Sequence, residues 1–353
     1  AEYLGKSREP VCDAYRVLAM KFVLKNVLLV LAVVVFCLAA FEGLTRLFLD
    51  DGMLYELEMW KYASNVKERD YRPDIGHRHR ANAAAHLMGV PVRTNAQGFR
   101  SDAIGKQAAP GVARIAFVGD SITMGWGVAE QDTFASRVIA ALTAAGRKVD
   151  GFNLGVGNYN TAQELALFRD AAAHLKPDII VLSYFINDAE PMPHYAVNGW
   201  LDRHSAAWVV LSYRLDSLAR QFGQSPDWKH YYRKLYDPDH DGWVKTQKAL
   251  DGFAATAQEL GARLIVFNIP ELREFKPYPF DDITATVRKT VEGQGVPFVD
   301  LLPTVEDMEP SSLWVTVPDP HPNARAAAAF AGGMVPEITS LLDGLCRQRN
   351  RGC

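Results

Sequence analysis

The sequence is short of the residues that bind nucleic acids and metal ions. Its 38 lysine and arginine residues are outnumbered by 41 aspartate and glutamate residues, which gives a formal net charge of -3, and no long basic run is present. This balance argues against a nucleic-acid partner. The chain has only 4 cysteines and 9 histidines, and their spacing matches no zinc motif. We therefore expect neither a metal ion nor a cofactor.

Long hydrophobic runs are also scarce, with one exception near the N-terminus. Residues 22–41 read FVLKNVLLVLAVVVFCLAAF, and with Leu44, Leu47 and Phe48 the apolar helix is long enough to cross a bilayer of about 30 Å. The flanking charges are Lys6, Arg8, Arg16, Lys21 and Lys25 before it and Glu42, Asp50 and Asp51 after it. This asymmetry predicts a cytoplasmic segment at residues 1–21, a single transmembrane helix at 22–48, and everything later outside the cytoplasm.

A cleaved signal peptide is the alternative interpretation, because Met20 followed by Lys21 resembles a translation start with a basic segment. The residues LAA before Phe41 make a poor cleavage site for a signal peptidase. Phe36 directly before Cys37 does not fit the cleavage site of a lipoprotein. A retained anchor is the interpretation that we prefer.

Cysteine positions agree with this topology. Cys12 falls on the cytoplasmic side and Cys37 within the apolar run, so only Cys346 and Cys353 lie in an oxidising space. They could close a small loop in the tail, residues 346–353. Two free thiols on a frayed tail are the alternative.

Residues 49–112 show no strong period and are predicted to form an accessory region beside the main domain. Glycine, proline and asparagine punctuate residues 72–100, which suggests extended segments and turns. Its histidines, His77, His79 and His86, have no acidic or cysteine partners nearby. We interpret them as surface or turn residues.

From Arg114 onward, short β-rich runs alternate with longer amphipathic ones. Five runs predict strands: ARIAFVGD, VDGFNLG, PDIIVLSY, ARLIVFNI and VPFVDL. The intervening segments predict helices at residues 133–145, 161–174, 244–260 and 282–292. This alternation predicts a parallel sheet with helices on both faces, whose ligands bind at the carboxyl ends of the strands.

Ser121 lies at such a strand end, in FVGDSITMG. A serine there is either a helix cap or a nucleophile, which needs a positioned base because a hydroxyl is weakly nucleophilic at neutral pH.

Several ordered motifs favour the nucleophile. Gly119, Asp120 and Ser121 resemble block I of the SGNH (GDSL-like) hydrolases, and the resemblance runs from Arg114 to about Leu342. It implies a flavodoxin-like three-layer α/β/α domain, here residues 113–345, with a five-stranded parallel sheet.

His321 matches the catalytic histidine of block V, because Pro322 and Asn323 follow it as in the family's HPN. The resemblance implies that His321 is the general base and that Asp319 orients it. The family often spaces these residues as DxxH, whereas this chain has Pro318 at that place and Asp319 one residue closer.

The remaining blocks concern the oxyanion hole, formed in the family by three groups. Block III is FIND at residues 185–188, so Asn187 would donate its side-chain amide while Asp188 and Glu190 fix the loop. Ser121 would donate its backbone N–H. Block II departs from the family: a glycine is common five residues after the strand-ending asparagine, and here the count from Asn153 reaches Asn158.

Two residues compete for this third donor. Asn158 is our first choice, because asparagine tolerates positive φ, and Gly157 is the second. A disabled hole is the third possibility.

Residues 191–243 form an insert too long for a simple connection. It is rich in aromatic residues: Trp200, Trp208, Tyr213, Trp228, Tyr231, Tyr232, Tyr236 and Trp243. These rings could stack on sugars in a lid near Ser121, or form the core of a helical cap.

The resemblance implies acyl transfer through an acyl-serine intermediate. If water accepts the acyl group, the protein is a serine esterase that acts on O-acyl groups, most simply O-acetyl groups, of an envelope glycan. If a sugar hydroxyl accepts it, the protein is an O-acyltransferase. By analogy, a membrane-bound O-acyltransferase would be a partner. The competing class is a catalytically degenerate scaffold in a membrane complex, and the discriminating feature is whether Ser121 and His321 approach within hydrogen-bond reach.

Overall fold

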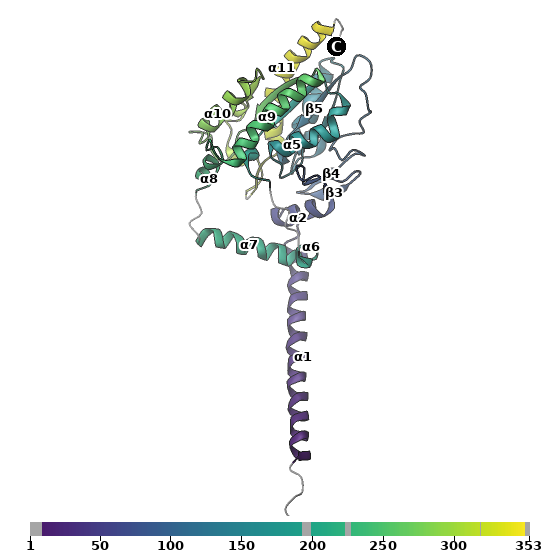
Figure 1. The fold of residues 1–353 in the computed structure, drawn as a ribbon, viewed down its shortest axis with the longest axis vertical. Helices are drawn as coiled ribbons and strands as arrows, with labels where there is room; N and C mark the ends of the chain where they lie inside the picture. Colours follow the sequence, from purple (N-terminus) through teal and green to yellow (C-terminus); the bar gives the residue numbers. More distant parts are fainter. Residues whose placement is uncertain (1–8, 193–198, 223–226, 318, 350–353) are drawn as a thin grey trace, which may run out of the picture.

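A five-stranded parallel sheet forms the centre of the structure, a computed structural model that describes residues 9–192, 199–222, 227–317 and 319–349 (Figure 1). The strand order is β6-β5-β7-β8-β9, with all pairs parallel. The strands are β5 (Ala113–Val118), β6 (Val149–Asn153), β7 (Ile179–Tyr184), β8 (Arg263–Asn268) and β9 (Phe298–Asp300). All residues of β5 and β7 are buried, which explains their continuous apolar sequences. The predicted sheet is confirmed.

Helices cover both faces of the sheet. They are α4 (Phe134–Ala144), α5 (Thr161–Leu167), α9 (Asp241–Leu260), α10 (Asp281–Glu292) and α11 (Ala324–Arg349). The chain moves from β5 to β6 and then reverses across β5 to β7. Because parallel crossovers are right-handed, α4 lies on one face and α5, α9 and α10 on the other. α11 packs against α4, and α5 packs against α9.

The predicted helix at residues 161–174 is irregular in its second half. α5 ends at Leu167, and the chain continues as one π-helical turn, Phe168–Ala172, and a 3-10 turn, Ala173–Leu175. The alternating pattern of the sequence predicted a helix here but not its change from α-helical to π-helical and 3-10 geometry.

The accessory region contains a helix that its weak periodicity did not predict. α2 (Tyr55–Asn65) is followed by two antiparallel hairpins. Their strands are β1 (Lys67–Arg69), β2 (His77–His79), β3 (Ala84–Leu87) and β4 (Val90–Arg93). Tyr62 of α2 and Trp126 of the main domain belong to one buried cluster. The region is therefore packed into the domain.

The interpretation of the histidines as surface or turn residues is wrong for two of the three. His77 and His79 are in strand β2 and are 1% and 4% exposed; only His86 is exposed. Strand β2 is covered by α2 and by the loop after β6, contacts between distant segments that a local sequence pattern does not reveal.

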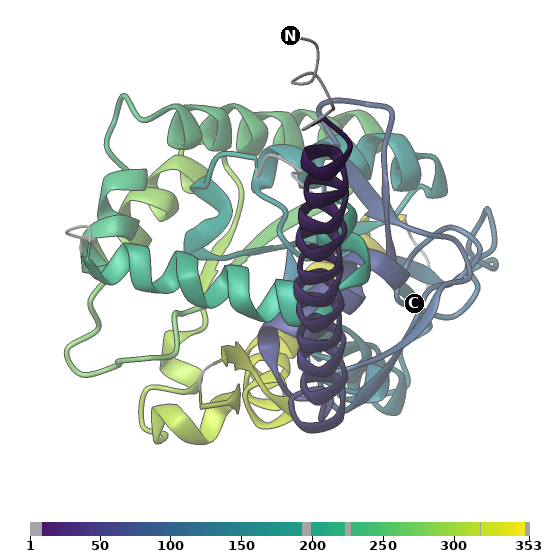
Figure 2. The same cartoon turned by 90° about the horizontal axis from the view of Figure 1, so that it is seen from below.

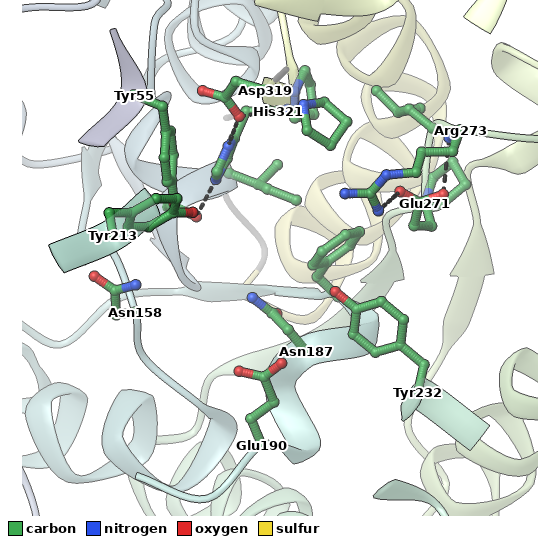
Figure 3. A pocket seen from close by; sticks show the side chains of 17 residues that line it. Tyr55, Asn158, Asn187, Glu190, Tyr213, Tyr232, Glu271, Arg273, Asp319 and His321 are labelled. Atoms are coloured by element: carbon green, nitrogen blue, oxygen red, sulfur yellow. Dashed lines mark hydrogen bonds and ion pairs between the residues drawn. The ribbon is translucent and has the colours of Figure 1, made fainter. Parts of the chain in front are cut away.

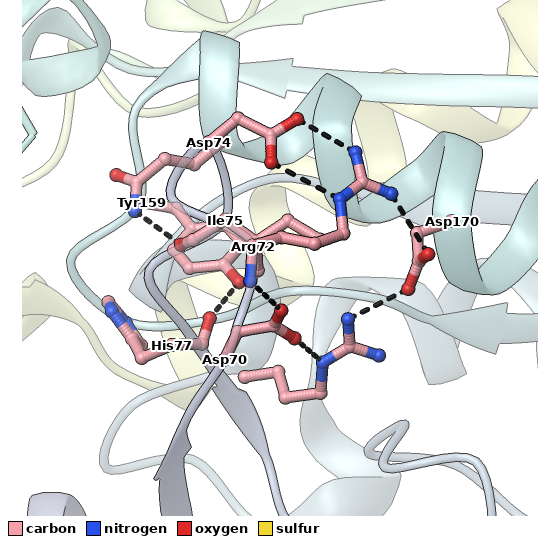
Figure 4. Close-up of polar contacts among 9 residues, drawn as sticks. Asp70, Arg72, Asp74, Ile75, His77, Tyr159 and Asp170 are labelled. Atoms are coloured by element: carbon pink, nitrogen blue, oxygen red, sulfur yellow. Dashed lines mark hydrogen bonds and ion pairs between the residues drawn. The ribbon is translucent and has the colours of Figure 1, made fainter.

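An arginine–aspartate network fixes the first hairpin to the π-helical turn that follows α5 (Figure 4). Asp170 accepts from Arg72 Nη1 at 2.9 Å and from Arg78 Nη2 at 2.7 Å. Arg78 also pairs with Asp70, and Arg72 with Asp74. Hydrogen bonds from the two arginines hold the pKa of Asp170 below its usual value.

The N-terminal helix α1 (Glu9–Phe48) projects from the domain (Figure 1). Its stretch Tyr15–Phe48 is long and apolar enough to cross a membrane, and its most apolar part is not covered by other described residues. α7 (Ala206–Phe222), which belongs to the insert, runs crosswise to α1 where α1 meets the domain, and Figure 2 shows both from below.

The insert also contains α6 (Trp200–His204) and α8 (Trp228–Leu235). The buried Tyr236 and Trp243 belong to the hydrophobic core, as the cap interpretation predicts, whereas Trp200, Trp208, Tyr213 and Tyr231 are exposed. Stacking of these rings on sugars stays a prediction.

Of the two cysteines predicted to pair, Cys346 is disulfide-bonded, and Cys353 lies outside the described residues, as does Pro318.

Candidate active site

Ser121 is the first residue of the one-turn helix α3 (Ser121–Met124), directly after β5. The cap of this helix is Asp120, whose Oδ1 accepts from the backbone N–H of Ile122 at 2.8 Å, so Ser121 is not the cap. The turn is tight: a Cβ at Gly119 would lie 2.1 Å from Thr123 Oγ1, and one at Gly155 would lie 2.1 Å from the Met124 nitrogen. These two glycines let the strand ends approach α3 closely.

Ser121, His321 and Asp319 are joined by hydrogen bonds (Figure 3). Ser121 Oγ lies 2.9 Å from His321 Nε2, and His321 Nδ1 lies 2.5 Å from Asp319 Oδ1. A carboxylate accepts the Nδ1–H, which leaves Nε2 as an acceptor for the serine hydroxyl. Asp319 and His321 are separated by only one residue, a shorter spacing than the DxxH that is common in the family. They nevertheless form with Ser121 the series of hydrogen bonds that is typical of a serine triad.

Asp319 is held by a second donor, Trp126, that sequence analysis did not identify. Trp126 Nε1–H donates to Asp319 Oδ2 at 2.8 Å, and the carboxylate is only 2% exposed. Burial opposes the ionised form, but the hydrogen bonds from His321 and Trp126 outweigh it and hold the pKa of Asp319 below its usual value. Asp319 is thus ionised at neutral pH and keeps the His321 ring in one tautomer.

Asn323, the last residue of HPN, anchors the loop that carries His321. Its Nδ2 donates to the carbonyl oxygens of Ser312 and Trp314, and its Oδ1 accepts from the N–H groups of Arg325 and Ala326 at the start of α11. The loop is therefore tied at both ends.

The predicted oxyanion donors meet at the same pocket. Asn187 and Asn158 both line it together with Ser121. Asn187 Nδ2 donates one hydrogen to Asp120 Oδ2 at 3.3 Å, and its amide carries a second hydrogen. Asn158 has φ of 66°, in the left-handed region that asparagine tolerates.

The structure separates the two candidates in the loop after β6. Gly157 N–H donates to Tyr62 Oη at 2.8 Å, deep beneath the loop. No hydrogen bond joins the Asn158 N–H to any of the described residues. This geometry favours Asn158 over Gly157 as a donor to a bound group.

The loop is clamped from below by three residues of the accessory region, which we name the loop clamp: Tyr62, Lys67 and His77. Lys67 Nζ donates to the Gly157 carbonyl oxygen at 2.6 Å and to Asn158 Oδ1 at 2.8 Å, and His77 Nε2 lies 3.1 Å from the same carbonyl oxygen. Complete burial lowers the pKa of Lys67 to about 7. No sequence motif marks Lys67, and its partner Asn158 is 91 residues away in the chain.

His79, two residues after His77 on the same face of strand β2, supports the loop clamp. Tyr62 Oη and His79 Nε2 are 2.6 Å apart. Burial lowers the pKa of His79 to about 3, so the ring is neutral and Nε2 can accept from the tyrosine hydroxyl while that hydroxyl accepts from Gly157.

Two buried carboxyl groups lie behind the site. Asp188 Oδ2 accepts from the backbone N–H of Phe185 at 3.0 Å, while both oxygens of Glu164 lack a hydrogen-bond partner among the described residues. Burial raises the pKa of both groups well above its usual value; the negative charge of Asp120 adds to the rise at Glu164, and the charges of Glu164 and Asp120 add to it at Asp188. These shifts disfavour negative charge behind the pocket.

The pocket in front of Ser121 has a volume of about 340 Å³. One wall carries Arg273, which is paired with Glu271 at 2.6 Å, and Tyr232. The opposite wall carries Tyr55 of α2, whose ring stacks on the His321 ring at 6.2 Å between centroids, and Tyr213 of α7. The pocket suits a substrate with a small reacting group and polar neighbours.

A serine, a histidine and an aspartate hydrogen-bonded in series at the carboxyl edge of a parallel sheet form the arrangement found in serine hydrolases of several α/β folds, the SGNH hydrolases among them. The sequence profile of the GDSL-like lipase/acylhydrolase family matches residues 117–329, and the chain belongs to this family. A comparison with curated proteins finds no match.

Several solved structures are similar in fold. The structure of TesA is 15% identical, with 65% of this chain and 99% of that chain covered and a TM-score of 0.45. The acetylxylan esterase Axe2 from Geobacillus stearothermophilus is 17% identical, with coverage of 64% and 94% and a TM-score of 0.43. A lipase/acylhydrolase from Enterococcus faecalis is 16% identical, with coverage of 65% and 96% and a TM-score of 0.41.

Proposed function

We propose that the protein is a membrane-anchored serine esterase that removes O-acyl groups, most simply O-acetyl groups, from a glycan outside the cytoplasm. The observation that carries the proposal is the hydrogen-bonded series of Ser121, His321 and Asp319 opening onto a 340 Å³ pocket. A degenerate scaffold would have no need of this alignment, which supports the enzyme.

In the first half-reaction, Ser121 Oγ attacks the ester carbonyl carbon while His321 Nε2 takes the hydroxyl proton. The carbonyl oxygen becomes an oxyanion, and the donors proposed for it are the backbone N–H groups of Ser121 and Asn158 and the amide of Asn187. Each such donor is typically worth about 3 kcal/mol of transition-state stabilisation. The bond to the leaving oxygen then breaks, and His321 gives its proton to the departing alcohol.

In the second half-reaction, water attacks the acyl-serine. His321 removes a proton from the water, the oxyanion forms again in the same place, and collapse of this intermediate returns the proton to Ser121 Oγ. The products are a free carboxylic acid and the unmodified enzyme.

The proposed location follows from α1. Its apolar length fits a bilayer, and the excess of basic residues before it favours a cytoplasmic N-terminus. The catalytic domain then lies outside, where its substrates would be acylated polymers of the cell envelope.

The test is hydrolysis of p-nitrophenyl acetate by the full chain in mild detergent. We expect Ser121→Ala and His321→Ala each to reduce kcat at least about 10⁴-fold, because the nucleophile and the base act as a unit. The full chain is needed because Glu42 of α1 binds the start of α7.

Ser136→Ala is a suitable control, because this serine is outside the pocket and its hydroxyl contacts Thr133. Its rate should equal that of the wild type. Equal background rates in the wild type and in both active-site variants would refute the esterase.

A further inference from the structure

α7 presents an apolar stripe to the outside of the molecule. Trp208, Leu211, Leu215 and Leu218 are 36%, 39%, 53% and 47% exposed. Their spacing of three, four and three residues places them on one side of the helix. Tyr213 lies on the other side, where it lines the catalytic pocket. The helix therefore faces the active site with one side and has an uncovered apolar surface on the other.

The start of α7 is fixed to α1 by a single carboxylate. Glu42 accepts from the N–H groups of Ala206 and Ala207, each at 3.0 Å, and from Ser205 Oγ at 2.8 Å. The Ser205 hydroxyl in turn accepts from the N–H of Trp208 at 3.0 Å. The first three N–H groups of α7 are thus satisfied, and Arg46 of α1 adds a bond to the His204 carbonyl oxygen.

This attachment sets the depth of α7. At 1.5 Å per residue, about 20 residues cross a hydrocarbon core of about 30 Å, so a crossing within residues 22–48 ends between Phe41 and Phe48. Glu42 and Arg46, which bind the start of α7 and the end of α6, lie in this stretch, so the outer surface of the bilayer is at the level of α7. Figure 1 shows α7 extending sideways from this point, crosswise to α1.

The elements that pack against the start of α7 also expose apolar side chains. Leu47, Phe48 and Leu49 at the end of α1 are exposed, as are Trp200 and Leu201 of α6. Tryptophan is enriched at the membrane–water boundary, where its ring is half in hydrocarbon and half in contact with polar groups. Helices with one apolar side lie flat in this zone.

We propose that α7 is an interfacial helix whose stripe, Trp208, Leu211, Leu215 and Leu218, is buried in the outer leaflet of the bilayer that α1 crosses. The inference rests on the proposed anchorage and extends it: the domain is attached to the membrane at two places. Because Tyr213 lies on the opposite side of the same helix, the pocket is held within about one helix diameter, roughly 10 Å, of the lipid surface. The enzyme therefore acts on esters presented at the membrane surface.

The experiment measures where a spin label on the stripe resides. Leu215→Cys and Lys289→Cys are made separately in the full chain with Cys12→Ala and Cys37→Ala, labelled, and reconstituted into vesicles of phosphatidylethanolamine and phosphatidylglycerol. Lys289 is an exposed residue of α10, a helix that Figure 1 shows beyond α7 as seen from α1. Collisions with oxygen, which concentrates in lipid, are compared with collisions with a water-soluble nickel complex.

We expect the ratio of oxygen to nickel collisions to be several-fold higher at Leu215 than at Lys289. Equal, water-like ratios would overturn the inference. A Leu215 label that is shielded from both reagents would also overturn it, since protein, either a second copy or a partner, would then cover the stripe.

A flotation assay with the same vesicles distinguishes failure of the proposed anchorage from failure of the inference about α7. If the chain does not float with the vesicles, the proposed anchorage fails and the inference fails with it. If the chain floats and the Leu215 label contacts water, only the inference fails. Hydrolysis of p-nitrophenyl acetate, a soluble ester, reports on the catalytic proposal independently of both.

Discussion

At the scale of single residues, the site depends on how two polar groups are held. Both oxygens of Asp319 have donors, His321 on one and Trp126 on the other. Asn158 is held at positive φ, with its side-chain oxygen bound to Lys67. Neither Trp126 nor Lys67 lines the pocket, so both act as positioning residues.

Trp126→Phe should lower kcat about tenfold with little change in KM. The variant leaves Asp319 Oδ2 buried without its donor, which costs about 1 to 3 kcal/mol and lets the pKa of Asp319 rise. Kinetics with p-nitrophenyl acetate over a range of pH values measure both effects. Trp314→Phe is the matched control, because the Trp314 indole donates to the Leu272 carbonyl oxygen rather than to Asp319; an equal loss in both variants would contradict the role of Trp126.

Lys67→Met should lower kcat about tenfold or more while KM changes little, because the loop clamp loses its bonds to Gly157 and Asn158. Lys289→Met, at an exposed position, controls for the loss of a positive charge. If Lys67→Met alters KM alone, the clamp positions substrate and not the oxyanion donor.

Asn158→Gly should keep kcat within a few-fold of the wild type, whereas Asn158→Val should lower it strongly. Glycine adopts positive φ freely and retains the backbone N–H, whereas a β-branched residue is strained there. Steady-state kinetics of the two variants decide between backbone and side chain: equal inactivation would show that the asparagine amide itself is required.

At the scale of elements, predictability followed the composition of each segment. The five strands of the sheet were predictable because each is a short β-rich run bounded by turn residues. β9 is only three residues long but lies within the apolar run VPFVDL. β1 to β4, with the sequences KER, HRH, AAHL and VPVR, are as short and lie in no such run. Ser121, Asn187 and His321 were identifiable because each lies in a motif. Tyr62, Lys67 and Trp126 lie in no motif, and their hydrogen-bond partners in the site are 91 to 193 residues away in the chain.

Strand β2 should make the fold sensitive to mild acid. Burial lowers the pKa of His77 and of His79 to about 3, while a histidine in the unfolded chain titrates near about 6.5. Below this value the unfolded chain binds protons that the folded chain does not, so the free energy of unfolding falls as pH falls from about 6.5 towards 3. The slope approaches about 1.4 kcal/mol per pH unit for each histidine.

Denaturant titrations between pH 6.5 and 5 would measure this slope. His79→Gln should reduce the slope by the contribution of one histidine. His86→Gln, at an exposed position, should leave the slope unchanged. An identical slope in all three proteins would mean that neither buried histidine is responsible.

At the scale of the whole molecule, α1 is part of the architecture of the enzyme as well as its proposed anchor. Glu42 joins α1 to α7, and α7 contributes Tyr213 to the pocket. The accessory region likewise contacts the loop after β6, because Tyr62 of α2 accepts a hydrogen bond from Gly157 of that loop. Segments before residue 113 therefore support both sides of a site whose motifs all lie later in the chain.

Glu42→Ala should loosen the start of α7. Loss of a helix cap costs about 1 kcal/mol, so amide hydrogens of residues 206–209 should exchange about fivefold to tenfold faster. Hydrogen–deuterium exchange of the full chain in detergent measures this, with the exposed Glu259→Ala of α9 as control. Unchanged exchange at α7 would show that Ser205 alone is a sufficient cap.

The separation of Ser121 and His321 along the chain, 200 residues, determines when the enzyme first becomes competent during its synthesis. Ribosomes add about 5 to 20 residues per second, so roughly 10 to 40 s pass between the two. During that interval the proposed nucleophile exists without its proposed base. We therefore expect the nascent polypeptide to be inert towards esters until His321 has been added, by which time α1 has long since left the ribosome.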